Sequence, residues 1–476
     1  MNATNFAWTI AGTDPTGAAG MQADLKTFAA FGVSAGSVIT NVTAQNSDGV
    51  FATAPVTCDL LSAQMRHLAA ELPPFVIKIG LLGAADSIST LVDNLPASAY
   101  VIYDPVFCAT SGGNLLAAET ITAAREFLFP RVDLLTPNRL EAETLVGYPI
   151  TESRIEKAAR TILDWGVKSV LIKGGHFSGK FCADFWTDGN DAAWFGHPRL
   201  DVKARGTGCT LASAIAAAKA RGETPRNAIA MAKIYLHREL RVSRAKRLPH
   251  LPWGDPFAPS DLVTLGLPES ESFSPAQNMG LYAIVDRAAN VKFLGELGVK
   301  TMQLRIKDLS GAALEREIST AIEFARNRNV LLFINDFWEL GLKLGAAGVH
   351  LGQEDLDTTH IAAIRKAKLK LGVSTHDFAE LARAHAVRPS YIALGPIFPT
   401  TTKVMRFGPQ GIAKVKLWRS LLDCPLVAIG GVNAERASQV LAAGADSLAV
   451  LSDLSDPLTA AEKVRGWNQI LKPSKG

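Results

Sequence analysis

The chain has 476 residues, of which 48% are hydrophobic and 20% charged, and its formal net charge at pH 7 is +4. A chain of this length is too long for one hydrophobic core of ordinary size, and the composition is that of a globular protein rather than a disordered or fibrous one. The small net charge argues against a nucleic-acid partner, and the absence of an apolar run of roughly 18 residues argues against a membrane span. We therefore expect two domains that bind neither nucleic acid nor membrane.

The cysteines point to a reducing compartment. There are five of them, and they show neither CxxC nor Cys/His metal spacing, which indicates neither a disulfide framework nor a zinc site. The amino terminus, MNATNFAWTI, has no basic flank and runs directly into an apolar segment. These features predict a cytoplasmic protein.

The first half of the chain alternates apolar segments with helical patterns. Strands are predicted at residues 6–12, 37–45, 75–80, 100–106, 132–138 and 169–175. A hairpin with a turn at Asp188-Gly189 follows them. Continuous apolar strands that end in Gly, Asp, Asn or Pro predict an α/β fold, a doubly wound sheet whose ligand lies at the carboxyl ends of the strands.

A proline-rich segment separates the two halves. Prolines stand at positions 249, 252, 256, 259, 268 and 275, and the segment ends in PESESFSP. Because proline removes hydrogen-bond donors and extends the chain, we interpret residues 249–277 as a linker. The predicted domains are therefore residues 1–248 and 278–476.

The second half carries eight short apolar segments. They lie at residues 281–286, 301–306, 331–336, 348–352, 369–375, 391–397, 426–432 and 447–452. Eight strand-helix units in about 200 residues predict a (β/α)8 TIM barrel.

A glycine-rich turn, RGTGCTLAS, opens a helix near residue 207 of the first domain. Gly206 and Gly208 allow a sharp turn, and the free amides of the helix amino terminus attract anions. Cys209 stands at the first helical position, where it could be a nucleophile, a base or only a small residue. Alone, this pattern is common in α/β proteins.

Other polar residues follow strands of the same domain. Asp24 lies on a second glycine-rich turn, residues 11–27, and Lys173 is a cation at a strand end. Asn138 and Glu141, three residues apart after a strand, could orient magnesium-bound phosphate. Together these residues predict a phosphate-handling site.

The same stretches resemble the hydroxymethylpyrimidine/phosphomethylpyrimidine kinase family of the ribokinase superfamily. The motifs are AGTDPTGAAG-QADLKTF, VTAQN, DPV-ATSG, TPN--EAE, KGGH and GTGCTLASAIA, over about residues 5 to 245. The resemblance implies a ribokinase-like fold and phosphorylation, with ATP and Mg²⁺, of a pyrimidine alcohol and then of its monophosphate. It assigns residues as follows: Asp24 and Gln45 to the aminopyrimidine; Asn138, Glu141 and Lys173 to ATP and magnesium; Gly206, Gly208 and Cys209 to catalysis. The family usually has histidine before GTGC, whereas this chain has Arg205, which we expect to strengthen phosphate attraction.

Most ribokinase relatives carry aspartate at the position of Cys209. A helix amino terminus lowers a thiol pKa, so a thiolate base is physically available. Phosphoryl transfer nevertheless asks mainly for positioning and charge neutralisation, and an aspartate would repel an acceptor that is already a phosphate. Our hypothesis is that Cys209 assists the first phosphorylation as a base and only tolerates the second.

Polar residues also follow the strands of the predicted barrel. Gln303, Arg305 and Lys307 alternate and share one face, and Asn335-Asp336 and Asp355 follow the next two strands. Carboxylates beside cations indicate a magnesium diphosphate. Further residues lie after later strands, at Thr400, Thr402, Lys403, Gly430, Gly431 and Ser452. His350 is interpreted as a core histidine.

This half resembles thiamine phosphate synthase over about residues 280 to 470, through LYAIVDR, QLRIKD, INDFWELGLKLGAAGVHLGQEDL, GPIFPTTTK and AIGGV. Many members have Arg-Glu-Lys where this chain has Arg305-Ile306-Lys307, but both cations remain. The resemblance implies that a thiazole phosphate displaces diphosphate from hydroxymethylpyrimidine diphosphate. It assigns residues as follows: Asp336 and Asp355 to Mg²⁺; Gln303, Arg305, Lys307, Asn335, Ser374 and Lys403 to the pyrimidine diphosphate, with Arg305 and Lys403 catalytic; Thr400, Thr401, Thr402, Gly431, Leu451 and Ser452 to the thiazole phosphate.

The two resemblances together imply a bifunctional thiamine-biosynthesis enzyme acting on small molecules. Two alternatives stay open: a pyridoxal-type kinase in the first half, or a noncatalytic sensor or scaffold in one half. The sequence decides neither the oligomeric state nor whether the diphosphate passes directly between sites.

Overall fold

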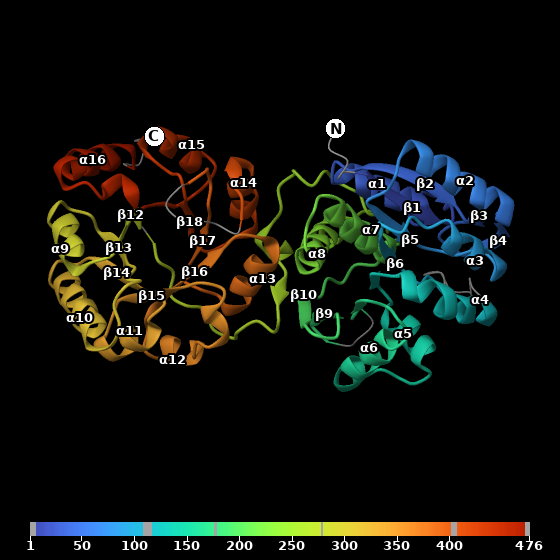
Figure 1. Cartoon of the computed structure of the whole chain (residues 1–476), viewed down its shortest axis with the longest axis horizontal. Helices are drawn as coiled ribbons and strands as arrows, with labels where there is room; N and C mark the ends of the chain where they lie inside the picture. The colour runs from blue at the N-terminus through green and yellow to red at the C-terminus, as the bar shows by residue number, and fades with distance from the viewer. Residues whose placement is uncertain (1–5, 108–116, 176–178, 278, 401–406, 472–476) are drawn as a thin grey trace. The chain divides into compact units, whose positions relative to one another are not determined.

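The computed structural model describes residues 6–107, 117–175, 179–277, 279–400 and 407–471. The chain divides into two compact units (Figure 1). One unit comprises Met1–Asp255 and Val263–Leu267, and the other comprises Pro256–Leu262 and Pro268–Gly476.

The described part of the first unit is built on a nine-stranded sheet. Its spatial order is β11-β10-β9-β8-β7-β6-β5-β1-β2, parallel from β2 to β8 and antiparallel from β8 to β11. The strands are β1(Phe6–Ala11), β2(Ser34–Ile39), β5(Val76–Ile79), β6(Tyr100–Tyr103), β7(Leu134–Leu135), β8(Val170–Ile172), β9(Phe181–Thr187), β10(Ala192–Pro198) and β11(Thr264–Leu265). The predicted doubly wound α/β fold is thus confirmed.

Helices cover this sheet. They are α1(Gly20–Ala30), α2(Cys58–Glu71), α3(Asp86–Asp93), α4(Ala118–Ala123), α5(Arg139–Val146), α6(Ile155–Leu163), α7(Thr207–Ala220) and α8(Pro225–Arg241), with short turns η2(Ala124–Leu128), η3(Phe129–Arg131) and η4(Glu152–Arg154). Side chains alternate along the central strands, so that Ile77 and Ile79 join the apolar core with α2, α3, α5 and α6. Lys78, between them, instead contacts Asp24 of α1.

The predicted strand 37–45 is two strands. After β2 the chain leaves the main sheet and forms β3(Asn41–Gln45), which pairs with β4(Val50–Pro55) in a separate two-stranded sheet. Thr40 Oγ1 donates to Leu81 O at 2.5 Å, and Asn41 Nδ2 donates to Leu82 O at 2.8 Å. These bonds to the segment after β5 turn the chain at Thr40, and Gln45 is therefore held at the end of the small sheet.

The predicted hairpin is confirmed as β9 and β10, which pair antiparallel. Gly189 has a φ of +91°, and the Asp188 side chain accepts from Asn190 N and Asp191 N. The left-handed backbone explains the glycine of the turn.

The proline-rich segment predicted as a linker contains structure. Thr264–Leu265 form β11 on β10, and η5(Pro259–Asp261) precedes it. Glu269 N donates to Ala386 O, and Phe273 N donates to Arg388 O. This segment is therefore hydrogen-bonded to its neighbours over much of its length.

The second unit contains, among its described residues, a closed barrel of eight parallel strands. They are β12(Gly280–Val285), β13(Thr301–Leu304), β14(Leu331–Asn335), β15(Gly348–Leu351), β16(Lys370–Thr375), β17(Tyr391–Leu394), β18(Leu426–Ile429) and β19(Ser447–Val450). Each coincides with a predicted segment, which confirms the TIM barrel.

Helices surround the barrel (Figure 1). They are α9(Ala288–Glu296), α10(Gly311–Asn327), α11(Trp338–Leu344), α12(Ile361–Lys366), α13(Phe378–Val387), α14(Gly411–Leu421), α15(Ala434–Ala442) and α16(Pro457–Ile470), with turns η6(Asp355–Asp357) and η7(Ser452–Leu454). The interior is packed with side chains that include Tyr282, Phe333 and Tyr391. Because this core fills the barrel, a ligand has room only at its mouth.

Candidate active sites

A cavity of about 690 Å³ lies at the carboxyl ends of β1, β5, β6 and β8 in the first unit. Among the predicted site residues, its lining includes Gln45, Asn138, Glu141, Lys173, Gly206, Gly208 and Cys209. This is the edge at which open α/β sheets bind ligands, beside the point where the strand order reverses. The structure thus brings seven predicted residues together.

Close packing requires a glycine at position 206 of the GTG turn and leaves little room for a side chain at Gly208. Gly206 has a φ of +74°, and a Cβ there would lie 1.9 Å from Ala18 O. A Cβ at Gly208 would lie 3.3 Å from Lys173 Nζ. The amino terminus of α7, with Thr207, Gly208 and Cys209, faces the cavity and offers backbone N–H groups to an anion.

The thiol of Cys209 does not have the lowered pKa that its place at a helix start suggested. Burial raises the pKa of Cys209 to about 11, and the charges of Asp24 and Asp104 act in the same direction. Lys78 opposes this shift without cancelling it. A thiol with this pKa is protonated at physiological pH, which does not favour the hypothesis that Cys209 acts as a base.

Asp104 is a site residue that sequence reasoning missed. It follows β6, is 1% exposed, and accepts from Lys173 Nζ at 2.6 Å and from Thr136 Oγ1 at 3.2 Å. Burial lowers the pKa of Lys173, but the charges of Asp104 and Glu141, together with the hydrogen bond to Asp104, outweigh burial, so that the pKa stands above its ordinary value. Lys173, the cation predicted to bind phosphate, is therefore held in place by the carboxylate of Asp104. The position of Asp104 directly after a strand is the sequence feature that could have identified it as a site residue.

Asn138 and Glu141 form a capping box at the start of α5. Asn138 Oδ1 accepts from Glu141 N at 3.0 Å, and Glu141 Oε2 accepts from Asn138 N at 2.6 Å. Burial raises the pKa of Glu141 to about 7, an effect that Lys173 opposes and Asp104 reinforces. Both residues line the cavity while serving as helix caps.

Asp24 is not brought to the cavity wall. Its carboxylate is fully buried and accepts from Thr9 Oγ1 at 2.6 Å, Ser213 Oγ at 2.7 Å and Lys78 Nζ at 2.8 Å. Lys78, which the sequence analysis did not single out, lines the cavity instead. The ion pair thus presents the lysine to the cavity, and the proposed contact of Asp24 with a pyrimidine finds no support in this arrangement.

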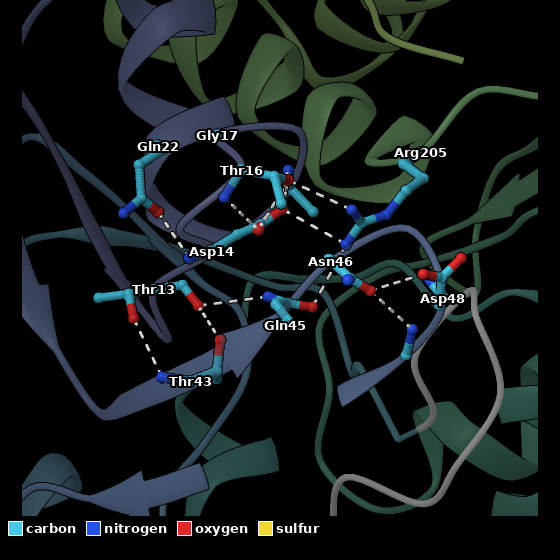
Figure 2. Close-up of polar contacts among 12 residues, drawn as sticks. Thr13, Asp14, Thr16, Gly17, Gln22, Thr43, Gln45, Asn46, Asp48 and Arg205 are labelled. Atoms are coloured by element: carbon cyan, nitrogen blue, oxygen red, sulfur yellow. Dashed lines mark hydrogen bonds and ion pairs between the residues drawn. The ribbon is translucent and has the colours of Figure 1, made fainter. Parts of the chain in front are cut away.

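Arg205 contacts the loop after β1 and the end of β3, as Figure 2 shows. Its Nη1 donates to Thr16 Oγ1 at 3.2 Å, and its Nη2 donates to Gln45 Oε1 at 3.3 Å and lies 3.5 Å from Asp14 Oδ2. The guanidinium is therefore bonded to groups around Gln45, and the attraction of phosphate by Arg205 stays a prediction.

A second cavity, of about 630 Å³, lies at the carboxyl ends of the barrel strands. The predicted residues that line it are Gln303, Arg305, Lys307, Asn335, Asp336, Asp355, Ser374, Thr400, Gly431, Leu451 and Ser452. Thr401, Thr402 and Lys403 fall outside the described residues.

Asp336 and Asp355 lie together at the mouth of the barrel. Lys307 Nζ contacts Asp336 Oδ2 at 2.5 Å, and Gly352 N donates to Asp355 Oδ2 at 2.9 Å. Burial raises the pKa of Asp355, and the adjacent Asp336 adds to this effect. Asp336 also has a φ of +65°, a conformation that few residues other than glycine adopt.

These carboxylates suit a hard divalent cation, because a cation between them would offset the repulsion of their two negative charges. The described residues contain no cluster of three or more His, Cys, Asp or Glu side chains placed to hold a metal. Protein oxygen atoms other than these two carboxylates, or substrate phosphates, would have to complete the coordination.

A chain of hydrogen bonds crosses the floor of the second cavity. His350 bonds through Nε2 to Ser374 Oγ at 2.8 Å and through Nδ1 to Tyr391 OH at 2.7 Å. Tyr391 OH bonds to Tyr282 OH at 2.7 Å, and Gln303 Nε2 donates to Tyr282 OH at 3.4 Å. Burial lowers the pKa of His350 to about 4, so this histidine is neutral at pH 7. His350 is buried, as predicted, but its hydrogen bonds also connect Ser374 and Gln303, two of the residues predicted to contact the substrate.

Gly430 and Gly431 form a tight turn after β18. Their φ values are +92° and +65°, and a Cβ on Gly431 would lie 2.7 Å from Pro399 O. The turn and the start of η7 at Ser452 lie on the same side of the barrel mouth, the usual phosphate position of this fold.

The fold and the two cavities define a two-domain α/β enzyme, with an anion-binding turn in one domain and cations beside carboxylates in the other. The family model for phosphomethylpyrimidine kinase matches residues 14–251, and the model for thiamine monophosphate synthase matches residues 278–454.

Among the described residues, we find no helix with the length and hydrophobicity that a membrane span requires.

Curated relatives extend the match to nearly the whole chain. A probable thiamine biosynthetic bifunctional enzyme from Oryza sativa subsp. japonica is 33% identical over 97% of this chain and 88% of its own length. The thiamine biosynthetic bifunctional enzyme TH1 from Arabidopsis thaliana is 32% identical over 98% of this chain and 93% of its own length. A thiamine-phosphate synthase from Yersinia pseudotuberculosis is 49% identical over 45% of this chain and 97% of its own length.

The chain therefore belongs to the family of bifunctional thiamine biosynthetic enzymes, in which a phosphomethylpyrimidine kinase is fused to a thiamine-phosphate synthase.

Proposed function

We propose that the first unit phosphorylates 4-amino-5-hydroxymethyl-2-methylpyrimidine and then its monophosphate, and that the second unit condenses the resulting diphosphate with 4-methyl-5-(2-phosphoethyl)thiazole. The observation that carries this proposal is the presence, in one chain, of an anion-binding turn beside Gln45 and of a carboxylate and cation cluster above a neutral barrel floor. The product of the two phosphorylations carries a diphosphate group, and this group is the one that leaves in the reaction proposed for the barrel site.

In the kinase unit, Gln45 holds the acceptor ring and the amino terminus of α7 holds the transferred phosphoryl group. Lys173 and Lys78 bring positive charge to the same cavity. ATP supplies the phosphoryl group, and Asn138 and Glu141 would hold Mg²⁺, which would supply neutralisation of the phosphate charge. Because the transition state is loose, positioning and charge neutralisation suffice. The hydroxyl proton of the alcohol passes to an oxygen of the transferred phosphoryl group or to water, and the neutral thiol of Cys209 need not accept it.

In the synthase unit, Arg305 and Lys307 stabilise the departing diphosphate, and Asp336 and Asp355 would hold Mg²⁺, a Lewis acid for the same oxygens. The bond between the pyrimidine methylene and the diphosphate oxygen breaks, and its electron pair leaves with the diphosphate. The lone pair of the thiazole nitrogen then forms the new C–N bond, and no proton is lost. A neutral His350 beneath the ring avoids repelling the positive charge on the methylene.

A single reaction mixture tests both activities on the full chain. The pyrimidine alcohol, the thiazole phosphate, ATP and Mg²⁺ should together give thiamine phosphate, and omission of the thiazole phosphate should make the pyrimidine diphosphate accumulate. Failure to form thiamine phosphate from added pyrimidine diphosphate would show that the barrel is not a synthase.

The same preparation addresses the alternative for the first unit. With ATP and Mg²⁺, we expect kcat/KM for the pyrimidine alcohol to exceed that for pyridoxal. The reverse order would assign the first unit to pyridoxal phosphorylation.

A further inference from the structure

The guanidinium of Arg205 touches the one side chain to which we assign recognition of the pyrimidine. We propose that Arg205 is a specificity-determining positioning residue that holds the Gln45 amide in one orientation and so selects a ring with an amino group beside a ring-nitrogen acceptor. This inference rests on the proposed function of the first unit.

The two ends of the Gln45 amide have different partners (Figure 2). Gln45 Oε1 accepts from Arg205 Nη2 at 3.3 Å, and Gln45 Nε2 donates to Thr13 O at 3.3 Å. Rotation of the amide by half a turn would set its NH₂ group against the guanidinium and its oxygen against the carbonyl. Because both contacts would then be repulsive, the pair of partners permits one orientation.

Arg205 is itself held from several directions. Its Nη1 donates to Thr16 Oγ1 at 3.2 Å, and its Nη2 lies 3.5 Å from Asp14 Oδ2, which is fully buried. Asp14 is fixed in turn because it accepts from Thr16 N and Ala19 N, both at 2.9 Å. The planar, forked guanidinium can serve these groups together, whereas a lysine ammonium is a point charge on a flexible stem.

The backbone on either side of Arg205 is also constrained. Arg205 N donates to Lys246 O at 3.0 Å, and the following Gly206 packs against Ala18 O. The same loop after β1 thus contacts both the GTG turn and the Arg205 side chain. The position of the guanidinium is therefore set by the turn that binds anions.

A fixed amide reads the order of donor and acceptor on a ring edge. The oxygen and the nitrogen of an amide can each make a second hydrogen bond, the oxygen as acceptor and the nitrogen as donor. A 4-aminopyrimidine presents a donor, its amino group, next to an acceptor, its ring nitrogen. The 4-oxo analogue presents the reverse order, because its oxygen accepts and its ring N–H donates. It therefore requires the orientation that Arg205 and Thr13 O oppose.

The test compares kcat/KM for the 4-amino and 4-oxo forms of the pyrimidine alcohol in the full-length chain. We expect wild type to favour the amino form and Arg205→Lys, which keeps the charge near Asp14 and loses the fork, to reduce that preference by about 10-fold, the factor of one hydrogen bond. KM for ATP should stay unchanged, and the loss on the amino form should lie in KM rather than kcat.

Two further variants complete the comparison. Arg226→Lys is the matched control, since Arg226 pairs with Asp191 at the hairpin turn and does not line the cavity. It should keep the wild-type preference. Thr16→Val removes one support of the guanidinium and should shift the preference in the same direction as Arg205→Lys, which gives a second measurement if the lysine variant fails to fold.

The outcomes separate this inference from the function on which it rests. An unchanged preference in folded Arg205→Lys overturns the inference, and so does a rise in KM for ATP without a change in preference, which would place Arg205 on the phosphate side. Absence of phosphorylation of the amino alcohol by wild type would instead contradict the proposed function.

Discussion

The two cavities place their charges differently, although both lie at the carboxyl ends of parallel strands. In the first unit, Lys78 and Asp24 are fully buried and paired, and Lys173 and Asp104 are nearly so. In the barrel, Lys307 is 54% exposed and its partner Asp336 is 25% exposed. Lys78 and Lys173, which line the kinase cavity, are therefore each paired with a buried carboxylate, whereas the synthase cavity has partly exposed charges at its rim and a neutral floor.

The difference follows from what each site must do. A buried charge without a partner costs several kcal/mol, so charges inside a sheet-and-helix interface must be satisfied by the protein itself. Charges at a barrel mouth keep water until a ligand displaces it and can be redirected to a diphosphate at small cost. We therefore expect removal of a charge to affect mainly stability in the first unit and mainly activity in the second.

The largest stability effect should come from Asp24→Asn. It leaves Lys78 buried without its counter-charge, and we expect the first unit to lose about 3–5 kcal/mol of free energy of unfolding. Hydrogen exchange of the peptide covering β1 in urea measures this, with barrel peptides as an internal reference. Lys168→Met, which breaks an ion pair whose lysine is 67% exposed, should cost less than about 1 kcal/mol. Equal losses in the two variants would contradict the comparison.

Asp336→Ala should show the opposite pattern. Because Asp336 stands at the rim beside Lys307, we expect the condensation rate to fall by roughly 10²- to 10³-fold with kinase activity unchanged. Barrel stability should fall by no more than about 1 kcal/mol, since alanine tolerates the left-handed backbone at this position less well than aspartate. The matched control is Glu315→Ala, which removes an exposed carboxylate paired with Lys343 at 2.6 Å, away from the cavity. Normal condensation by Asp336→Ala would exclude the magnesium assignment.

The sequence was sufficient to predict the architecture because local patterns determine it. Each barrel strand is a short apolar run, and the polar residues and glycines that follow the strands of each unit placed the cavity of that unit. The capping box at Asn138 and Glu141 is also a local pattern, an Asn followed three residues later by Glu, and could have been recognised.

What the sequence could not show depends on residues that are distant along the chain. The break at Thr40 results from a hydrogen bond to Leu81 O, and the pKa of Cys209 depends on burial together with Asp24, Lys78 and Asp104. No regular spacing in the sequence predicts that these residues come into contact. Arg205 illustrates the same limit, since its partners Thr16 and Gln45 meet it only in the folded chain.

A smaller effect concerns the pH dependence of the first unit. Burial raises the pKa of Glu141 from 4.5 to about 7, so between these values the folded state holds a proton that the unfolded chain releases. The contribution of Glu141 to the free energy of unfolding should therefore fall as the pH rises from about 4.5 to 7, by on the order of 1 to 3 kcal/mol. Burial lowers the pKa of His250 to about 4, so this histidine contributes with the opposite sign over the same range, and the contribution of Glu141 is measured as the difference between wild type and Glu141→Gln. Glu143→Gln on the same helix should keep the wild-type pH dependence. Identical pH dependence in wild type and Glu141→Gln would contradict the raised pKa of Glu141.

The smallest effect should come from Cys209, the residue whose role the sequence left most open. A thiol with a pKa of about 11 is protonated throughout the range from pH 7 to 9. If its thiolate were the base, the first phosphorylation would accelerate about tenfold per pH unit over that range, whereas we expect no such slope. Cys209→Ala should accordingly retain the rate within about 10-fold, the loss reflecting altered packing at the start of α7 rather than a missing proton acceptor. A slope of one in the wild type that disappears in Cys209→Ala would restore the base. Its absence would show that burial keeps the thiol neutral in spite of the nearby charge of Lys78.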